Sequence, residues 1–265
     1  MLTVIEAIIL GIVQGIAEWL PISSEGMTTL VMINVFGKSL TESLPMAIWL
    51  HTGTLLSATV YFRNELKEIF REIPGFIKYR NLQNKDHTLI VFLIISTLLT
   101  GIVGLPLILF ATGWAEFSGK LATAFIGLLL VFTGLLQITA AKRAEKKTEP
   151  ALKDSFIVGI TQGFAALPGV SRSGITVSTL LLRNFQASDA LKFSFLMSIP
   201  AVLVAEIGMG AMGFLTIDAN SLLALFFAFL FGILTIDVFI KVAEKFDFSK
   251  FCIGLGLLSI LAYFL

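Results

Sequence analysis

Pro21-Ile22-Ser23-Ser24-Glu25-Gly26 and Pro168-Gly169-Val170-Ser171-Arg172-Ser173-Gly174 are the two polar interruptions that decide the fold of this chain. The first breaks an apolar stretch at 2–36, and the second breaks one at 155–182. Each apolar arm has about 10 to 14 residues, whereas a helix needs about 20 to cross a bilayer. The arms therefore predict two re-entrant helical hairpins with polar tips, since irregular backbone at membrane depth must line a cavity or lie inside protein.

The two broken stretches are related to each other. Shifted by 148 positions, the first aligns with the second without a gap and shares eight identical residues between positions 11 and 28. The identical pairs are Gly11 and Gly159, Ile12 and Ile160, Gln14 and Gln162, Gly15 and Gly163, Ala17 and Ala165, Ser23 and Ser171, Gly26 and Gly174, and Thr28 and Thr176. We interpret this as an internal repeat within a single transmembrane domain of residues 1–265, with repeat one at about 1–141 and repeat two at about 153–265.

The composition excludes a soluble globular domain. Apolar residues make up 56% of the chain and charged residues 14%, whereas a soluble domain carries about 25% charged residues. The net charge of +1 offers no basic footprint for nucleic acid. The single cysteine, Cys252, excludes an internal disulfide.

Six further stretches are apolar enough to be spanning helices. They lie at about 44–62, 88–110, 119–141, 190–212, 219–242 and 249–265. Three of them separate the two hairpins, and a re-entrant hairpin returns to its own side, so the hairpins must enter from opposite faces. Their two polar tips can then meet near the midplane of the bilayer. The predicted fold is an all-α integral membrane protein with six spanning helices and two re-entrant hairpins in an inverted-topology repeat.

The distribution of basic residues predicts the orientation. In this topology, sixteen of the 19 Lys and Arg residues fall on one side, mostly in the loops 63–87 and 142–153. Only Lys38 and Lys120 fall on the other side, and Arg172 lies at a tip. By the positive-inside rule the basic side is cytoplasmic. We therefore expect a multi-pass protein of the plasma membrane with both termini outward and a site that opens outward.

The hairpin tips carry the ionisable residues expected of a site. Charged groups at membrane depth are costly and usually functional, and here Glu18 and Glu25 flank one tip while Arg172 lies in the other. An Arg fork among serine hydroxyls and helix N-termini suits a phosphate. A neighbouring carboxylate suits a base or a cation ligand. The residues alone thus predict a site for a lipid phosphate within the bilayer.

These motifs resemble a known family. The run QGIAEWLPISSEG at 14–26 and the run PGVSRSG at 168–174 resemble the two signatures of the undecaprenyl-diphosphatase family of the bacitracin-resistance type. Those signatures read E/Q-x-x-x-E-F/W-L-P-x-S-S-x-G-H and P-G-x-S-R-S-G, and FSFLMSIP at 193–200 resembles a third family segment. The resemblance implies paired inverted hairpins and removal of the terminal phosphate of undecaprenyl (polyprenyl) diphosphate. This reaction recycles the carrier lipid for peptidoglycan or surface-glycan synthesis.

The resemblance also implies roles for individual residues. The catalytic residues would be Glu18, Ser24 and Arg172, with Ser24 as nucleophile. The substrate-binding residues would be Gln14, Ser23, Gly26, Gly169, Ser171, Ser173 and Gly174. Glu18 and Gln14 match a pair that binds a divalent cation, Mg²⁺ or Ca²⁺, or activates the attacking group. Helix capping is the alternative role for Ser24, Ser171 and Ser173.

One position departs from the family pattern. The family has His after the tip glycine, but this chain has Met27, which cannot transfer a proton. Loss of such a group typically costs about 10²- to 10⁴-fold in rate. Glu25, where the family commonly has Thr, is either a replacement group or a water-facing residue. His51, at a position where the family often has Gln, is either a pocket residue or a core histidine.

Two alternatives follow from this departure and from the architecture. Inverted repeats with broken helices also form secondary transporters, so the chain could flip a polyprenyl phosphate. It could instead be a catalytically weakened homologue that only binds lipid. The expected partners are a polyprenyl diphosphate lipid and the bilayer. The small-residue pairs Gly11/Gly15 and Gly159/Gly163 indicate either packing of the hairpin arms or a homodimer.

Overall fold

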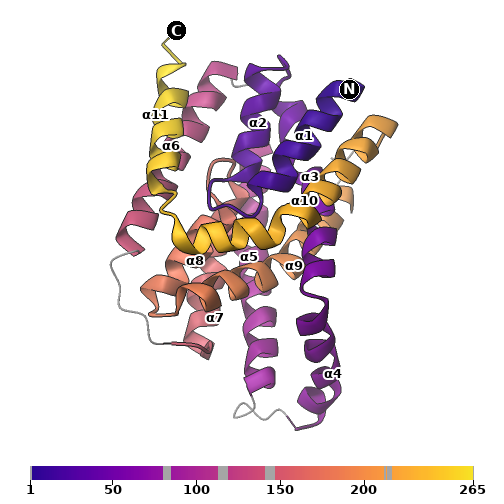
Figure 1. The fold of residues 1–265 in the computed structure, drawn as a ribbon, viewed down its shortest axis with the longest axis vertical. Coiled ribbons are helices and arrows are strands. Elements are labelled where there is room, and N and C mark those ends of the chain that lie inside the picture. The colour runs from indigo at the N-terminus through magenta and orange to yellow at the C-terminus, as the bar shows by residue number, and fades with distance from the viewer. Residues whose placement is uncertain are drawn as a thin grey trace.

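The structure is a computed structural model that describes residues 2–79, 85–112, 119–140, 147–211, 213 and 217–264. Over these ranges it is helical, apart from turns and an isolated bridge between Lys147 and Phe185 (Figure 1). The elements are α1 (Val4–Ala17), α2 (Ser24–Asn34), α3 (Leu40–Tyr61), α4 (Arg63–Tyr79), α5 (Lys85–Thr112), α6 (Gly119–Ala140), α7 (Leu152–Gly163), η2 (Phe164–Ala166), α8 (Arg172–Leu182), α9 (Ala187–Ala211), α10 (Ala219–Lys245) and α11 (Ser249–Leu261).

Four helices within the described ranges are long and apolar enough to cross a membrane, as expected of a helical membrane protein. They lie in α5, α6, α9 and α10, at His87–Phe110, Gly119–Ala140, Ala187–Ala211 and Ala219–Val242. These correspond to four of the six predicted spans, whose residues 141 and 212 fall outside the described ranges.

The other two predicted spans differ from these four. The span predicted at 44–62 is α3, a helix of 22 residues whose inner face carries polar His51, Thr54 and Ser57. The span predicted at 249–265 is α11, an apolar helix of only 13 residues. At 1.5 Å per residue, α11 is about 20 Å long, which is less than the ~30 Å of a hydrocarbon core.

The segment 63–87 is not the loop that we expected. Most of it forms α4, and α5 begins two residues before its end. Leu66, Ile69 and Phe70 recur at the spacing of one helix face, which is the period of an amphipathic helix. The polar face of this helix carries most of the charges of the segment, which gives the sequence the composition of a loop.

Each predicted hairpin is a pair of short helices around a polar turn. In the first pair, α1 ends at Ala17 and α2 begins at Ser24, where the Ser23 hydroxyl accepts a hydrogen bond from the Gly26 N–H at 3.2 Å. In the second pair, the Ser171 hydroxyl caps α8 through the Gly174 N–H at 3.0 Å. The same serine and glycine therefore start the returning helix in both halves of the chain.

The small residues of the outer arms are used for packing within the chain. Gly15 of α1 lies against α10, where an added Cβ would come within 2.8 Å of the Ala228 carbonyl oxygen. Gly159 of α7 lies against α5, where an added Cβ would come within 2.7 Å of the Ser96 Cα. Such close approach requires small residues. Arm packing therefore accounts for these glycines, and the homodimer stays a prediction.

The two tips contact each other at the centre of the bundle. The Gly169 N–H donates to the Ser23 hydroxyl at 3.2 Å, and the Ser173 hydroxyl donates to the Leu20 carbonyl at 3.2 Å. Trp19 is buried beside this contact, with its ring 5.6 Å from that of Phe195 and its indole N–H bonded to the Gly232 carbonyl. The expectation that residues near 18–26 and 168–174 meet is therefore confirmed by their hydrogen bonds.

We predict that Gly169→Ala destabilises the protein. Gly169 has a φ of +101°, and an added Cβ would lie 2.6 Å from the Ile126 carbonyl oxygen. Backbone strain and overpacking each cost about 1–3 kcal/mol. A clear fall in the melting temperature of the detergent-solubilised protein is expected. Gly254→Ala is the control because nothing lies within 4 Å of its added Cβ, and equal melting temperatures for the two variants would contradict the prediction.

An ionic contact joins α7 to α8 at the opposite end from the tips. Asp154 has a fully buried side chain, bonded by Lys147, by the Ala151 N–H at 2.7 Å and by Arg183 at 2.8 Å. Burial alone would raise the pKa of Asp154, but these hydrogen bonds outweigh it and hold the pKa below its usual value. The ionised form of Asp154 therefore stabilises the fold.

We predict that acid removes this stabilisation. Because the pKa of Asp154 is lower in the folded chain than in the unfolded chain, its contribution is complete above about pH 4 and is lost as the pH falls further. Asp154→Asn should cost about 2–3 kcal/mol at neutral pH, since it leaves two basic groups without their partner. Thermal unfolding at several pH values measures both effects. Asp237→Asn is the control. It removes exposed contacts with Lys241 and Tyr61 and should leave the melting temperature nearly unchanged.

Candidate active site

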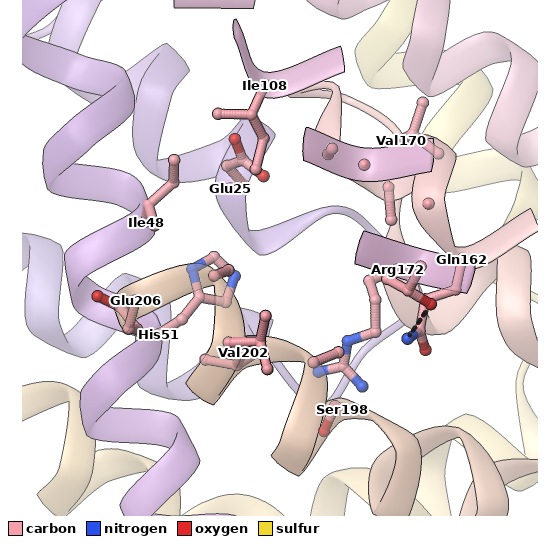
Figure 2. Close-up of a pocket in the computed structure, with 18 of the residues that line it drawn as sticks. Glu25, Ile48, His51, Ile108, Gln162, Val170, Arg172, Ser198, Val202 and Glu206 are labelled. Atoms are coloured by element: carbon pink, nitrogen blue, oxygen red, sulfur yellow. Dashed lines mark hydrogen bonds between the residues drawn. The ribbon is translucent and has the colours of Figure 1, made fainter. Parts of the chain in front are cut away.

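A cavity of about 320 Å³ lies where the two tips face α3, α5 and α9 (Figure 2). The tips and His51 form one polar side, and the other walls are mostly apolar with a few polar residues of α5, α7 and α9 among them. The polar residues that line it are Glu18, Ser23, Ser24, Glu25, His51, Thr97, Thr100, Gln162, Ser171, Arg172, Ser173, Ser198 and Glu206. The volume is within the usual range of small-molecule sites, about 300–1,000 Å³.

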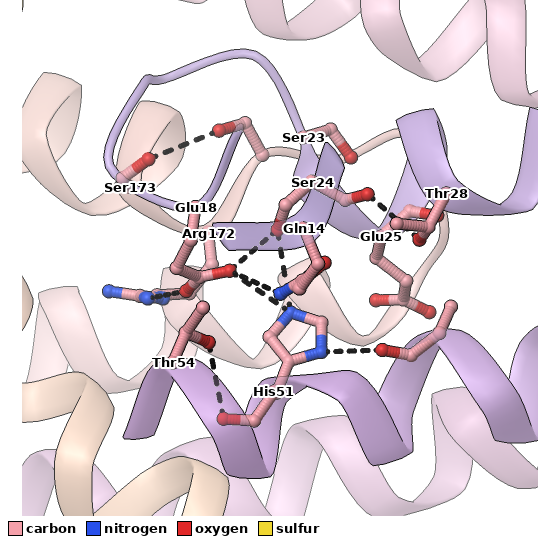
Figure 3. Close-up of polar contacts among 12 residues, drawn as sticks. Gln14, Glu18, Ser23, Ser24, Glu25, Thr28, His51, Thr54, Arg172 and Ser173 are labelled. Carbon is pink, nitrogen blue, oxygen red and sulfur yellow. Dashed lines mark hydrogen bonds and ion pairs between the residues drawn. The ribbon is translucent and has the colours of Figure 1, made fainter. Parts of the chain in front are cut away.

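Glu18 contacts several other residues on the polar side of the cavity (Figure 3). Its Oε2 accepts a hydrogen bond from the Ser24 hydroxyl at 2.6 Å and another from the Gln14 side-chain N–H at 2.9 Å. Its Oε1 is ion-paired with the Arg172 guanidinium. The carboxylate is almost entirely buried, at 6% exposure. Glu18 thus joins the first tip to the second through one charged contact.

Arg172 is held in place from two further directions. Its Nη1 donates to the Ser194 carbonyl of α9 at 3.3 Å, and its guanidinium carbon lies 5.6 Å from the centre of the Phe195 ring. An arginine has five N–H donors, and the contacts to Glu18 and Ser194 occupy two of its nitrogen atoms. The guanidinium lines the cavity, so it can still present N–H groups to an anion bound there.

His51 of α3 faces the same cluster. Its Nδ1 lies 2.8 Å from the Ala47 carbonyl one turn earlier. Its Nε2 lies 3.5 Å from the Ser24 hydroxyl oxygen and 3.4 Å from Glu18 Oε2. Of the two roles left open by the sequence, the structure places His51 in the pocket.

The serines divide into two kinds. Ser23 and Ser171 accept backbone hydrogen bonds at the starts of α2 and α8, and Ser23 also accepts one from the opposite tip. Ser24 instead directs its hydroxyl at Glu18 within the cavity. Capping therefore accounts for Ser23 and Ser171, whereas Ser24 has an oxygen positioned for chemistry.

Both returning helices begin at the cavity. Ser24 and Glu25 form the first turn of α2, and Arg172 and Ser173 form the first turn of α8. All four residues line the cavity. The positive ends of two helix dipoles therefore lie beside the Arg172 guanidinium, which is an arrangement that favours a bound anion.

Several predicted site residues lie behind the cavity wall rather than on it. Gln14 supports Glu18, and the three tip glycines Gly26, Gly169 and Gly174 permit close packing around Ser23, Ile126 and Ser171. Met27 is half-buried and does not line the cavity, whereas its neighbour Glu25 does.

Some lining residues were missed by the sequence reasoning. Gln162 of α7 donates to Thr100 at 3.0 Å, and Glu206 of α9 has a buried carboxylate without a hydrogen-bond partner among the described residues. The repeat offered a signal for Gln162, because it corresponds to Gln14. For Glu206 the only signal was a charge inside an apolar stretch, and nothing in the sequence placed it at the tips.

The donor atoms do not by themselves make a site for the predicted Mg²⁺ or Ca²⁺. Both oxygens of Glu18 are engaged, and the described part of the chain contains no group of three His, Cys, Asp or Glu side chains that could hold a metal ion. Gln14 Oε1 is buried there without a partner, but such cations take about six or more oxygen ligands. A cation that is already bound to the diphosphate would need fewer oxygen ligands from the protein. The roles of Gln14 and Glu18 as metal ligands stay a prediction.

The fold and the cavity define a helical membrane protein with a buried acid–serine–arginine site. A comparison with protein families matches residues 7–261 to the family described as bacitracin resistance protein BacA. The chain belongs to this family.

Three archaeal relatives are similar over nearly all of the chain. A protein named undecaprenyl-diphosphatase from Methanococcoides burtonii is 59% identical over 265 residues, which is the whole of both chains. Proteins of the same name from Methanothrix thermoacetophila and Haloarcula marismortui are each 38% identical, over 97% of this chain and 95% and 96% of their own. These names describe hydrolysis, so they do not support the transport or lipid-binding alternatives.

We predict that the adjacent serines of the first tip differ in their effect on stability. Ser23→Ala removes the acceptor shared by Gly26 and Gly169 and should cost about 1–3 kcal/mol, because both N–H groups are buried. Ser24→Ala removes a donor to Glu18 and a long contact with His51 but leaves no backbone N–H without its acceptor, so it should cost less. Thermal unfolding in detergent compares the two, and a larger loss for Ser24→Ala would contradict the assigned roles.

Proposed function

We propose that this protein hydrolyses undecaprenyl diphosphate to undecaprenyl phosphate and inorganic phosphate. The observation that carries the proposal is the Ser24 hydroxyl at 2.6 Å from Glu18, with Glu18 paired to Arg172 in one cavity. A nucleophile, an acidic group and a phosphate clamp are thereby brought together from two distant segments. The names of the full-length relatives point to the same reaction.

The cavity suits an anionic head on an apolar tail. Arg172 and the two helix N-termini face its polar side. Apolar side chains of α3, α5 and α9 form much of the opposite walls, namely Ile48, Leu105, Ile108, Val202, Val204 and Met209. A diphosphate can therefore enter while the chain attached to it remains in contact with apolar surface.

In the proposed reaction, Ser24 attacks the terminal phosphorus. A bond forms between Ser24 Oγ and that phosphorus, and the bond from the phosphorus to the bridging oxygen breaks. The bridging oxygen keeps the electron pair and leaves as undecaprenyl phosphate. Arg172 stabilises the charge on the phosphoryl oxygens, and Glu18 orients both Arg172 and Ser24. Water then releases phosphate from Ser24.

We also propose that α1–α2 and α7–α8 are re-entrant hairpins of an inverted repeat. The packing supports this, since α1 lies on α10 as α7 lies on α5, and α3 lies on α10 as α9 lies on α5. A two-fold relation between α1–α6 and α7–α11 would produce this pattern, with α1 equivalent to α7, α3 to α9 and α5 to α10. α11 and α3 would then complete six spans, with α11 reaching the interface through flanking residues or local thinning of the bilayer.

The proposed orientation keeps both termini on the outer side. The two termini lie at one end of the molecule, and α4, with four Lys and Arg residues, lies at the other (Figure 1). This arrangement agrees with a cytoplasmic α4 and an outward-facing first hairpin in the plasma membrane.

The proposal predicts phosphate release that depends on the site. Purified protein in detergent with Mg²⁺ should release phosphate from undecaprenyl diphosphate. Arg172→Ala and Ser24→Ala should each lower the rate by about 10²- to 10⁴-fold. Arg63→Ala is the matched control, because Arg63 lies at the start of α4 and bonds only its own helix junction in the described contacts.

Two results would contradict the proposed function. One is a wild-type protein that releases no phosphate, with either Mg²⁺ or Ca²⁺. The other is an Arg172→Ala variant within threefold of wild type, because the clamp would then be dispensable.

A further inference from the structure

We propose that His51 is the proton acceptor for the Ser24 hydroxyl and returns that proton later in the cycle. This assignment rests on the proposed function and deepens it by naming the general base. It depends on the position of the imidazole, which comes from α3 rather than from either tip (Figure 3).

The hydrogen bond at the far side of the ring fixes which nitrogen faces the serine. The Ala47 carbonyl oxygen can only accept, so His51 Nδ1 carries the hydrogen of the 2.8 Å contact. In the neutral imidazole, Nε2 is then the atom with the open lone pair. Nε2 lies 3.5 Å from the Ser24 hydroxyl oxygen. A distance of this size is typical of a nucleophile and base before the substrate tightens the site.

Glu18 is the competing acceptor, and its contacts make it the orienting group. Its Oε2 already accepts hydrogen bonds from Ser24 and Gln14, and its Oε1 is paired with Arg172. A carboxylate held by these donors is stabilised as an anion. It also lies 3.4 Å from His51 Nε2, so it can stabilise the imidazolium that forms when the proton moves.

No other histidine is placed to accept the proton of the Ser24 hydroxyl. The chain has only two, and His87 contacts Glu72 and Phe76 of α4 instead. Met27 follows the tip glycine but has no ionisable group and does not line the cavity. The other carboxylates on the cavity wall, Glu25 and Glu206, have no hydrogen bond to Ser24 among the described contacts.

A purely structural role explains only half of these contacts. A core histidine bonded to the preceding turn would account for the Nδ1 contact with Ala47. It does not account for Nε2 facing a serine and a buried carboxylate in a cavity, with the side chain 16% exposed.

Each proton that moves in the two steps has a donor and an acceptor. As the Ser24 Oγ–phosphorus bond forms, the hydroxyl proton passes to His51 Nε2, and undecaprenyl phosphate leaves with the bridging electron pair. Water then attacks the phosphorylated serine. The Ser24 Oγ–phosphorus bond breaks, Ser24 regains a proton from His51, and the water proton passes to His51 and on to solvent. In total, one undecaprenyl diphosphate and one water are consumed, and undecaprenyl phosphate, inorganic phosphate and one proton are released.

Two variants test the assignment by phosphate release from undecaprenyl diphosphate. His51→Gln keeps a polar side chain of similar reach but removes the basic nitrogen, and kcat should fall by about 10²- to 10⁴-fold with KM within threefold of wild type. His51→Ala opens a gap beside the cavity, and added imidazole should raise its rate at least tenfold. Pyrazole, a ring of the same size that is hardly basic, should not.

The controls separate this assignment from folding and from the proposed function. Melting temperatures should show that both variants fold. His51→Gln with a kcat within threefold of wild type would overturn the assignment while the proposed function stands. Rescue of His51→Ala by both rings, or by neither, would assign His51 to packing. A wild-type protein without activity would overturn the proposed function and this assignment together.

Discussion

The structure depends on one buried ion pair, between Glu18 of the first tip and Arg172 of the second. In a low-dielectric interior neither charge is tolerated alone, because removing one partner leaves the other uncompensated. The pair therefore requires that the two tips meet. Hydrogen bonds from Gly169 to Ser23 and from Ser173 to Leu20 fix the contact. The cavity is the space that this meeting leaves against α3, α5 and α9.

The internal repeat explains how such a pair can arise, and its departures explain the chemistry. The shift of 148 residues places Glu18 opposite Ala166 and Ser24 opposite Arg172. The capping serines and glycines are kept in both halves, because both returning helices must start at the same kind of turn. The charged and nucleophilic positions differ between the halves. The two related halves thus contribute different side chains to one cavity, with Glu18 and Ser24 from the first half and Arg172 from the second.

Much of this could be predicted from the sequence because the relevant signals are local. Apolar length identified α5, α6, α9 and α10, and polar breaks identified the tips and the meeting of Glu18 with Arg172. The shortness of α11 could not be predicted, since its apolar composition continues past the point where the helix ends. The helix α4 was not predicted, because charged residues separate the apolar residues that repeat along one helix face. The roles of Ser23 and His51 depend on neighbours 146 and 27 residues away, and no local pattern records such distances.

The role proposed for His51 would let the site differ from its family pattern at one position and keep a proton acceptor. A proton acceptor is needed at a point in space, within reach of the Ser24 hydroxyl, and not at a given place along the chain. The helix α3 passes directly beside the first tip, so His51 on its inner face comes within 3.5 Å of the Ser24 hydroxyl oxygen. The turn before His51 supplies the carbonyl that orients the ring. In this proposal, the basic nitrogen that Met27 does not supply comes from His51 on α3.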